Sequence, residues 1–310
     1  MTKWLAFWVL VLIYGSGFMF IDIALDQISP IHMNTIRFVV GASFLVVILY
    51  ARGGRIPTDW QTLKPLIIIG IMNNTVPFLL VAWAQLKGVD SGLTGVLIAT
   101  NPLFALVLAH FYFADERMTT PKVIGVTVGF VGVLVLASRN FEDGQLVTDG
   151  LVGQLAIITA AFLFAATATY SRRVMQDNIQ PLVVATTSSV VAAISLLILT
   201  LITTLTGDGM LAFDQWESDT VLAIAVLVVN NTVIAFLLLF YVIQELGVTR
   251  SSIIAYLVPV VSLSLGVLFR DEQIDAKVLL GTGIILSSIV IANFSFNRKR
   301  QQVAISSSSG

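Results

Sequence analysis

Two asparagine pairs are the polar groups of this chain best suited to bind a small solute. Each lies inside a long apolar stretch, as the triplet N-N-T at 73–75 and again at 230–232. An amide both donates and accepts hydrogen bonds, as recognition of an amino-acid-like zwitterion requires. The same amides could instead join helices, at about 0.6 kcal/mol per hydrogen bond. We expect Asn73 or Asn74, and Asn230 or Asn231, to face a cavity while its neighbour, about 100° around the helix, packs.

Two prolines inside apolar segments are surrounded by further polar side chains. Pro102 and Pro259 would each bend a helix and free the carbonyl four residues earlier. That carbonyl could face a solute or be satisfied by a nearby hydroxyl. We predict that the two prolines are kinks used in gating, with a static kink as the alternative. Their neighbours join the candidate substrate site: Thr100, Asn101, Tyr256 and Ser262.

Two aromatic residues, Trp83 and Tyr170, complete the candidate substrate site. Aromatic side chains near helix ends commonly anchor a protein at the membrane interface, and this alternative stays open for both.

Arg37 is a strongly basic residue within an apolar segment, shortly after Pro30. A charge inside a membrane is a candidate for function. An arginine near a helix end can also pair with a carboxylate, and Asp22 and Asp26 lie on the adjoining loop. We favour structural pairing over substrate contact for Arg37 and Asp22.

Composition places these residues in a membrane. The 310 residues are 57% hydrophobic and 11% charged, and the mean hydropathy is +0.93. A net charge of -1 argues against nucleic acid as a partner. The chain has no cysteine and two histidines without ligand spacing, so we expect no metal, no cofactor and no enzymatic activity.

A membrane helix needs about 20 apolar residues, and charges and turns divide the chain into ten such stretches. They do not alternate in polarity as the strands of a membrane barrel would, so we predict an all-α membrane protein. The predicted spans are 4–21, 31–50, 65–85, 92–112, 122–138, 151–170, 181–204, 219–243, 251–269 and 277–295.

The second half of the chain repeats landmarks of the first in the same order. Asn230, Gly247, Pro259 and Glu272 follow Asn73, Gly88, Pro102 and Glu116 by 157, 159, 157 and 156 residues. Five helices per half is an odd number, so the halves would cross the membrane in opposite senses around a central cavity. We predict repeats at 1–140 and 151–297 and a cytoplasmic tail at 298–310.

Lysine and arginine residues favour one side of the membrane, which the positive-inside rule makes cytoplasmic. With both termini inside, the outer loops hold only Lys87, Arg139, Arg270 and Lys277, and the cytoplasmic segments hold Lys3, Arg52, Arg55, Lys64, Arg117, Lys122, Arg172, Arg173, Arg250, Arg298, Lys299 and Arg300.

Small residues recur along the fifth and tenth segments. Gly125, Gly129 and Gly132, with Gly281 in the tenth, would allow close helix packing. No carboxylate lies at the centre of a predicted span, which favours facilitated export over obligate proton antiport.

The order of these motifs resembles the drug/metabolite transporter superfamily, in particular its EamA-like ten-helix exporters. The resemblance rests on stretches such as Y-G-S-G-F-M-F-I-D, N-N-T-V-P-F-L-L-V-A-W-A-Q and L-V-P-V-V-S-L-S-L-G-V-L-F-R-D-E. It implies a bacterial inner-membrane exporter of amino acids, their derivatives or other small metabolites, working by alternating access. It also implies that Glu116 and Glu272 bond loop amides for a structural purpose.

We therefore expect a monomeric transporter whose partners are a small-molecule substrate and the lipid bilayer. A nucleotide-sugar or phosphorylated-metabolite carrier on the same fold is the nearest alternative, and it would need more cationic groups than Arg37. A membrane scaffold without transport is the alternative from another class.

Overall fold

The computed structural model describes residues 2–113, 116–141, 148–175, 179–206, 216–251 and 253–308. Most of these residues are helical, and none of them lies in a strand. The elements are α1 (Thr2–Leu25), α2 (Pro30–Ala51), α3 (Trp60–Ile69), η1 (Gly70–Thr75), α4 (Val76–Leu86), α5 (Ser91–Ile98), α6 (Asn101–Tyr112), α7 (Thr120–Ala137), η2 (Ser138–Phe141), α8 (Asp149–Met175), α9 (Pro181–Thr206), α10 (Ser218–Val228), η4 (Val229–Ile234), α11 (Ala235–Leu246), α12 (Val248–Ser251), α13 (Ile254–Arg270) and α14 (Ala276–Ser308).

The all-helical prediction for a membrane protein is confirmed at this level. In the described part of the chain, eight helical segments are long and apolar enough to cross a membrane. The ninth and tenth predicted spans correspond to shorter apolar helices, Ile254–Arg270 and Ala276–Ala292. Helix α14 continues as far as Ser308, beyond the predicted end of the tenth span.

Local sequence explains where helices begin. Ser29 caps α2, accepting a hydrogen bond from the backbone N–H of His32, and Pro30 occupies the first turn. Asp59 caps α3, accepting from the N–H of Thr62 at 2.8 Å. Both side chains satisfy a backbone donor that the first turn of a helix leaves free.

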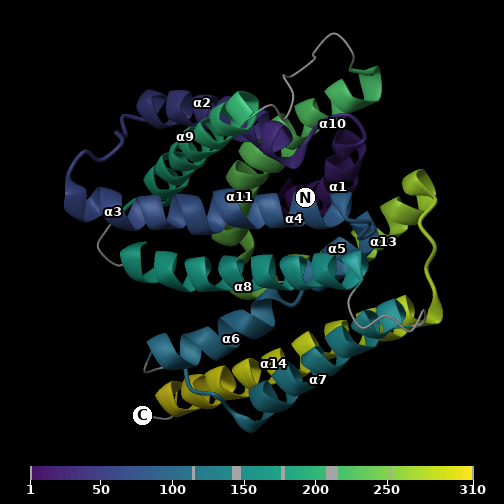
Figure 1. The fold of residues 1–310 in the computed structure, drawn as a ribbon. Coiled ribbons are helices and arrows are strands. Elements are labelled where there is room, and N and C mark those ends of the chain that lie inside the picture. The colour runs from purple at the N-terminus through teal and green to yellow at the C-terminus, as the bar shows by residue number, and fades with distance from the viewer. Residues whose placement is uncertain are drawn as a thin grey trace.

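The helices form one bundle in which the two halves of the sequence interleave (Figure 1). The main contacts each join a helix before residue 141 to one after residue 148: α7 with α14, α2 with α9, α1 with α13, and α4 with α8. Neither half therefore folds into a separate bundle, and any space between these pairs is lined from both.

Glycines lie where α7 and α14 run side by side (Figure 1). A Cβ atom at Gly125 would lie 2.7 Å from the carbonyl oxygen of Ser288, and one at Gly132 would lie 3.0 Å from that of Gly281. A Cβ at Gly129 would collide with Leu103. The absence of side chains at these positions is what allows the backbones to approach so closely.

Both N-N-T triplets lie in π-helical turns, which we did not predict. The N–H of Val76 bonds the carbonyl of Ile71 in η1, and that of Ala235 bonds Asn230 in η4. The threonine hydroxyls make matching contacts five residues back, Thr75 to Gly70 at 3.3 Å and Thr232 to Leu227 at 3.0 Å. A π turn holds one extra residue and is common at functional sites.

The two prolines shape their helices differently. Pro102 lies in the first turn of α6, and the fourth predicted span is divided into α5 and α6 between Ile98 and Asn101. In the first turn of a helix the backbone N–H has no acceptor within the helix, so proline, which lacks this N–H, costs no hydrogen bond there. Pro259 instead lies inside α13, which continues past it.

Arg139, after α7, contacts two carboxylates at one end of the bundle. Its Nη1 is 3.5 Å from Asp90 and its Nε is 2.6 Å from Asp275. Burial raises the pKa of Asp90 even though Arg139 opposes the shift. For Asp275 burial is the largest single effect and raises the pKa, but the N–H of Val278 and Arg139 together outweigh it, so its pKa is lowered.

We expect these two carboxylates to affect stability with opposite signs. Asp275 contributes stability above its ordinary pKa, and this is lost as the pH falls through its lower folded pKa. Ionised Asp90 disfavours folding, and that cost disappears as the pH falls below the ordinary value. At pH 7, Asp275→Ala should lower the free energy of unfolding by about 1 kcal/mol, since it also removes the cap of α14.

The matched variant Asp90→Ala should leave the melting temperature unchanged or raise it. Thermal unfolding in detergent between pH 7 and 3 measures both effects, and the Asp275→Ala deficit should shrink as the pH falls. A larger loss in Asp90→Ala than in Asp275→Ala would contradict the assignment.

Candidate functional site

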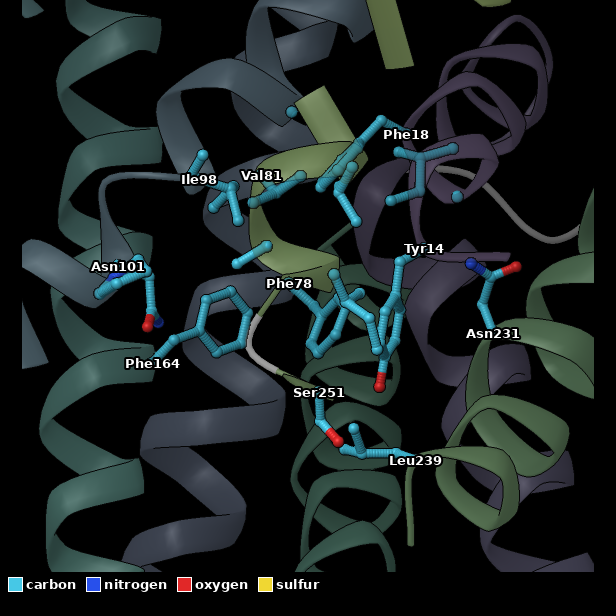
Figure 2. Close-up of a pocket in the computed structure, with 18 of the residues that line it drawn as sticks. Tyr14, Phe18, Phe78, Val81, Ile98, Asn101, Phe164, Asn231, Leu239 and Ser251 are labelled. Carbon is cyan, nitrogen blue, oxygen red and sulfur yellow. The ribbon is translucent and has the colours of Figure 1, made fainter. Parts of the chain in front are cut away.

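A cavity of about 600 Å³ lies at the centre of the bundle. Four aromatic rings, from helices α1, α4 and α8, line it and give it a largely apolar wall: Tyr14, Phe18, Phe78 and Phe164. Figure 2 shows Tyr14, Phe78 and Phe164 together in the middle of the view, with Asn101 and Asn231 on opposite sides. Cavities of this size and character commonly hold small molecules.

A second cavity, of about 330 Å³, shares part of this lining and continues toward one end of the bundle. It reaches Met175, the last residue of α8, and Pro181, the first of α9. The residues common to both cavities are Tyr14, Arg37, Phe78, Phe164 and Asn231. We treat the two as one central site, with its wider part deep in the bundle.

Arg37 lies at the junction of the two cavities, with only 5% of its surface exposed. Its Nε donates to the hydroxyl of Thr232 at 3.0 Å, and its guanidinium carbon lies 4.3 Å from the ring centre of Phe78. Its Nη1 is buried and has no hydrogen-bond partner. Among the described residues that line the two cavities, Arg37 is the one charged side chain.

The expected partners of Arg37 are taken by another arginine. Asp22 and Asp26 bond Arg270, at 2.6 Å and 3.0 Å, where α1 and α13 end together. Sequence proximity favoured Arg37, but α2 carries that residue two turns away from the loop, toward the middle of the bundle. The prediction that Arg37 pairs with these aspartates is wrong.

Asn73 and Asn74 both line the second cavity, and both are hydrogen-bonded within the protein. Asn73 Nδ2 donates to the side-chain Oδ1 of Asn74 at 2.8 Å, and Asn73 Oδ1 accepts from the hydroxyl of Thr167 of α8 at 2.8 Å. Asn74 donates to Ser188 of α9 at 3.3 Å. The first pair therefore joins η1 to two helices of the other half while facing the site.

Asn230 and Asn231 are divided between two environments. Asn231 lines both cavities; its Nδ2 donates to the carbonyl of Ile13 at 2.6 Å, and its Oδ1 is buried without a partner. Asn230 lies instead on a separate groove of about 720 Å³ lined from α1, α10 and α13. Asn231 is thus the member of this pair with a free acceptor at the central site.

Of the four polar residues around the prolines, one lines the central cavity and three make contacts within or between helices. Asn101 lines the central cavity and donates to Ala161 at 3.3 Å. The others make contacts within or between helices: Thr100 with Leu97, Ser262 with Gly92 and Pro259, and Tyr256 with Ile289.

Trp83 and Tyr170 are not among the residues that line the two cavities, although Tyr170 packs behind the wall of the second. Trp83 is 36% exposed, and Lys87 lies 6.0 Å from its ring. Tyr170 packs on a small apolar cluster that includes Leu66 and Val174. These positions agree better with interfacial anchoring and helix packing than with solute contact.

Sequence reasoning missed the aromatic lining of the site. Phe78 follows Asn74 by four residues, so helical spacing alone could have placed the two on one face. Tyr14 and Phe18 are also four residues apart, within α1. Phe164 had no such signal, because its neighbours in α8 are equally apolar.

Glu272 joins α13 to the start of α5, at the end of the bundle away from Met175 and Pro181. Its carboxylate accepts from the N–H of Ser91 at 2.7 Å, the hydroxyl of Ser91 at 2.5 Å and the N–H of Gly92 at 2.9 Å. The chain turns sharply before it, because Asp271 adopts a left-handed conformation with φ of 54°. Any side chain at Gly266 would collide with the carboxylate. We call this set of contacts the Glu272 clasp.

Glu116, which matches Glu272 in the repeat, has different partners. It lies 3.4 Å from Lys122 and 3.3 Å from Arg172. The described residues show no counterpart of the Glu272 clasp between Glu116 and the start of α12 or α13. Asp115, beside it, lies outside the described residues.

Comparison with known proteins gives consistent relatives over most of the chain. It is 24% identical to the uncharacterized transporter YoaV of Bacillus subtilis, covering 93% of this chain and 96% of the relative. It is 25% identical to the uncharacterized inner membrane transporter YedA of Escherichia coli, covering 92% and 89%. A probable amino-acid metabolite efflux pump of Escherichia coli is 24% identical, covering 96% and 97%.

A solved crystal structure shares the fold, with a TM-score of 0.63 and 20% identity over 95% of this chain and 98% of the other. The EamA-like transporter family matches residues 2–138 and 151–294, one match in each half. The interleaved helical bundle, its central cavity and these matches lead to one conclusion: the chain belongs to the EamA-like transporter family.

Proposed function

We propose that this protein exports small organic metabolites, amino acids or their derivatives, across the bacterial inner membrane by alternating access. The observation that carries the proposal is the central cavity, which is lined from both halves and extends toward the end of the bundle that holds Met175 and Pro181. A metabolite efflux pump among the relatives supports the direction and class of substrate.

The proposal includes two inverted five-helix halves. When the halves are exchanged, α1 corresponds to α8, α4 to α10 and α11, and α13 to α5 and α6. The contact of α1 with α13 then matches that of α8 with α5 and α6. The contact of α4 with α8 likewise matches that of α10 and α11 with α1. The matching π turns also support it. Helix pairs of this kind can rock around a shared site near the membrane midplane.

Alternating access requires that the site be open to one side of the membrane at a time. The two ends of the bundle differ accordingly, since one is cross-linked by side chains and the other holds cavity-lining residues. The end that holds the Glu272 clasp is also joined by Arg270 to α1 and by Arg139 to Asp90 and Asp275. The other end holds Met175, Pro181 and Ser251, which line the cavities. If both termini are cytoplasmic, as we propose, the side on which the second cavity lies faces the cytoplasm and the state is inward-open.

A nucleotide-sugar or other phosphorylated substrate is disfavoured by the charge of the site. Phosphate groups carry more than one negative charge and are usually held by several cationic side chains. The described lining residues supply Arg37 alone. A scaffold without transport would not need the unsatisfied groups of Arg37 and Asn231 at a shared cavity.

Labelling of single cysteines tests the proposed orientation and the open side, because the chain has no cysteine of its own. In inside-out vesicles Ala185→Cys, at the wall of the second cavity, should react with a membrane-impermeant maleimide. In right-side-out vesicles it should react at least tenfold more slowly. Equal rates from both sides would contradict an inward-open cavity.

Transport itself requires a direct assay. Proteoliposomes loaded with a mixture of labelled amino acids and their N-acylated or deaminated derivatives should release at least one of them faster than protein-free liposomes. Release of none of them, by protein that remains folded, would refute the proposed function.

A further inference from the structure

We propose that the central site selects organic acids with a single negative charge and an aromatic or branched apolar body, and that Arg37 binds their carboxylate. The inference rests on the proposed function in that the bound molecule is the transported one. It narrows the substrates to amino-acid derivatives whose amine is blocked or absent.

Charge balance is the first argument. Arginine remains protonated in proteins. A buried guanidinium without a counter-ion is costly, and Arg37 has none among the described residues. The ring of Phe78 and the hydroxyl of Thr232 offset that cost in part. A ligand with one negative charge would make the occupied site neutral, whereas a zwitterion would leave it positive.

The geometry of the guanidinium is the second argument. Thr232 holds Nε at 3.0 Å and Phe78 lies 4.3 Å from the guanidinium carbon, which together fix the plane of the group. The terminal nitrogens are then left for a ligand, and Nη1 is already buried without a partner. A carboxylate matches such donors and forms charge-assisted hydrogen bonds with them.

The rest of the lining argues against an ammonium group on the ligand. A desolvated ammonium needs an acidic side chain or several carbonyl oxygens. The described lining residues include no acidic side chain, and Asn231 Oδ1 is their one buried side-chain oxygen without a partner. One such acceptor suits a neutral donor, for example an acylated amine or a hydroxyl.

The apolar wall defines the remainder of the ligand. Phe18 and Phe164 line the wider cavity beside Ile98 and Val81 (Figure 2). Burying a ring or a branched chain there removes apolar surface from water at about 25 cal/mol per Å². An acid with such a body would use the charged and the apolar parts of the site at once.

Four probes that share one phenyl ring test the inference with the purified full-length protein. N-acetylphenylalanine and 3-phenylpropanoate carry one negative charge, phenylalanine is a zwitterion, and phenylalaninamide is a cation. In equilibrium binding at pH 6, where the amine of phenylalaninamide is protonated and both acids are ionised, we expect both acids to bind at least tenfold more tightly than phenylalanine. Phenylalaninamide should bind more weakly still.

Arg37→Met should weaken binding of the two acids by about 10- to 100-fold, which corresponds to the free energy that a hydrogen bond between charged groups contributes to binding. It should also raise the melting temperature of the ligand-free protein, because it removes an uncompensated buried charge. Arg37→Lys keeps the charge without the planar group and should give an intermediate affinity; it also serves if Arg37→Met does not fold. The matched control is Arg173→Met at an exposed position, which should change neither property.

Tighter binding of phenylalanine or phenylalaninamide than of the acids would overturn the inference, as would binding of no probe. So would unchanged binding of the acids in both Arg37 variants. Transport separates this inference from the proposed function. If proteoliposomes transport phenylalanine but neither acid, the inference fails and the transporter stands. If the acids bind through Arg37 but nothing is transported, the site stands and the proposed export fails.

Discussion

Glu272→Ala should open the end of the bundle that the Glu272 clasp holds together. The variant removes three hydrogen bonds to one carboxylate, from the N–H and hydroxyl of Ser91 and the N–H of Gly92. Bonds to a charged group are worth about 1.5–3 kcal/mol each, and part of this is recovered when water replaces the carboxylate. A net loss of 1.4 kcal/mol shifts a two-state equilibrium tenfold.

The change can be followed with a cysteine at Thr94, which is fully buried in α5 beyond the clasp. In right-side-out vesicles, we expect Thr94→Cys to react with a membrane-impermeant maleimide at least tenfold faster when Glu272→Ala is present. Glu272→Gln should give a smaller increase, since the amide still offers one oxygen acceptor.

Glu116→Ala is the matched control, because it removes the corresponding residue of the other half. In this state Glu116 contacts Lys122 and Arg172 at the opposite end. Its removal should therefore leave the labelling rate at position 94 unchanged. Equal acceleration by both variants would show that general loosening, and not the Glu272 clasp, controls access.

Gly125→Ala should destabilise the protein even though alanine favours helix. Its new methyl group would lie 2.7 Å from the carbonyl oxygen of Ser288 and 2.8 Å from the N atom of Ala292, both backbone atoms of α14. A side chain could rotate away from such a contact, but a backbone cannot, so α7 and α14 must separate. Overpacking of this kind costs about 1–3 kcal/mol.

Gly283→Ala provides a control with the opposite expected sign. No atom lies within 4 Å of the position its Cβ would take, and the residue is exposed on α14. This variant should gain up to about 1 kcal/mol from helix propensity alone. Thermal unfolding of both variants in one detergent measures the two changes in stability. An equal loss of stability in both variants would show that the close contact of α7 with α14 is not what destabilises Gly125→Ala.

The sequence alone determined the membrane class, the helical content and the family. These depend on the length of apolar stretches and on the order of local motifs such as N-N-T and the final D-E, which do not depend on what each helix packs against. The same reasoning located the ends of most helices, because charges, prolines and capping residues act within a few residues of themselves.

Only the tertiary structure decided which polar groups meet. Ser91 and Glu272 are 181 residues apart, and Arg37 meets Thr232 across 195 residues, so no local pattern could pair them. The π turns also alter the register of η1 and η4: one extra residue rotates the following faces by about 100°. The packing of the helices around η4 leaves Asn231 at the central site and Asn230 on another groove.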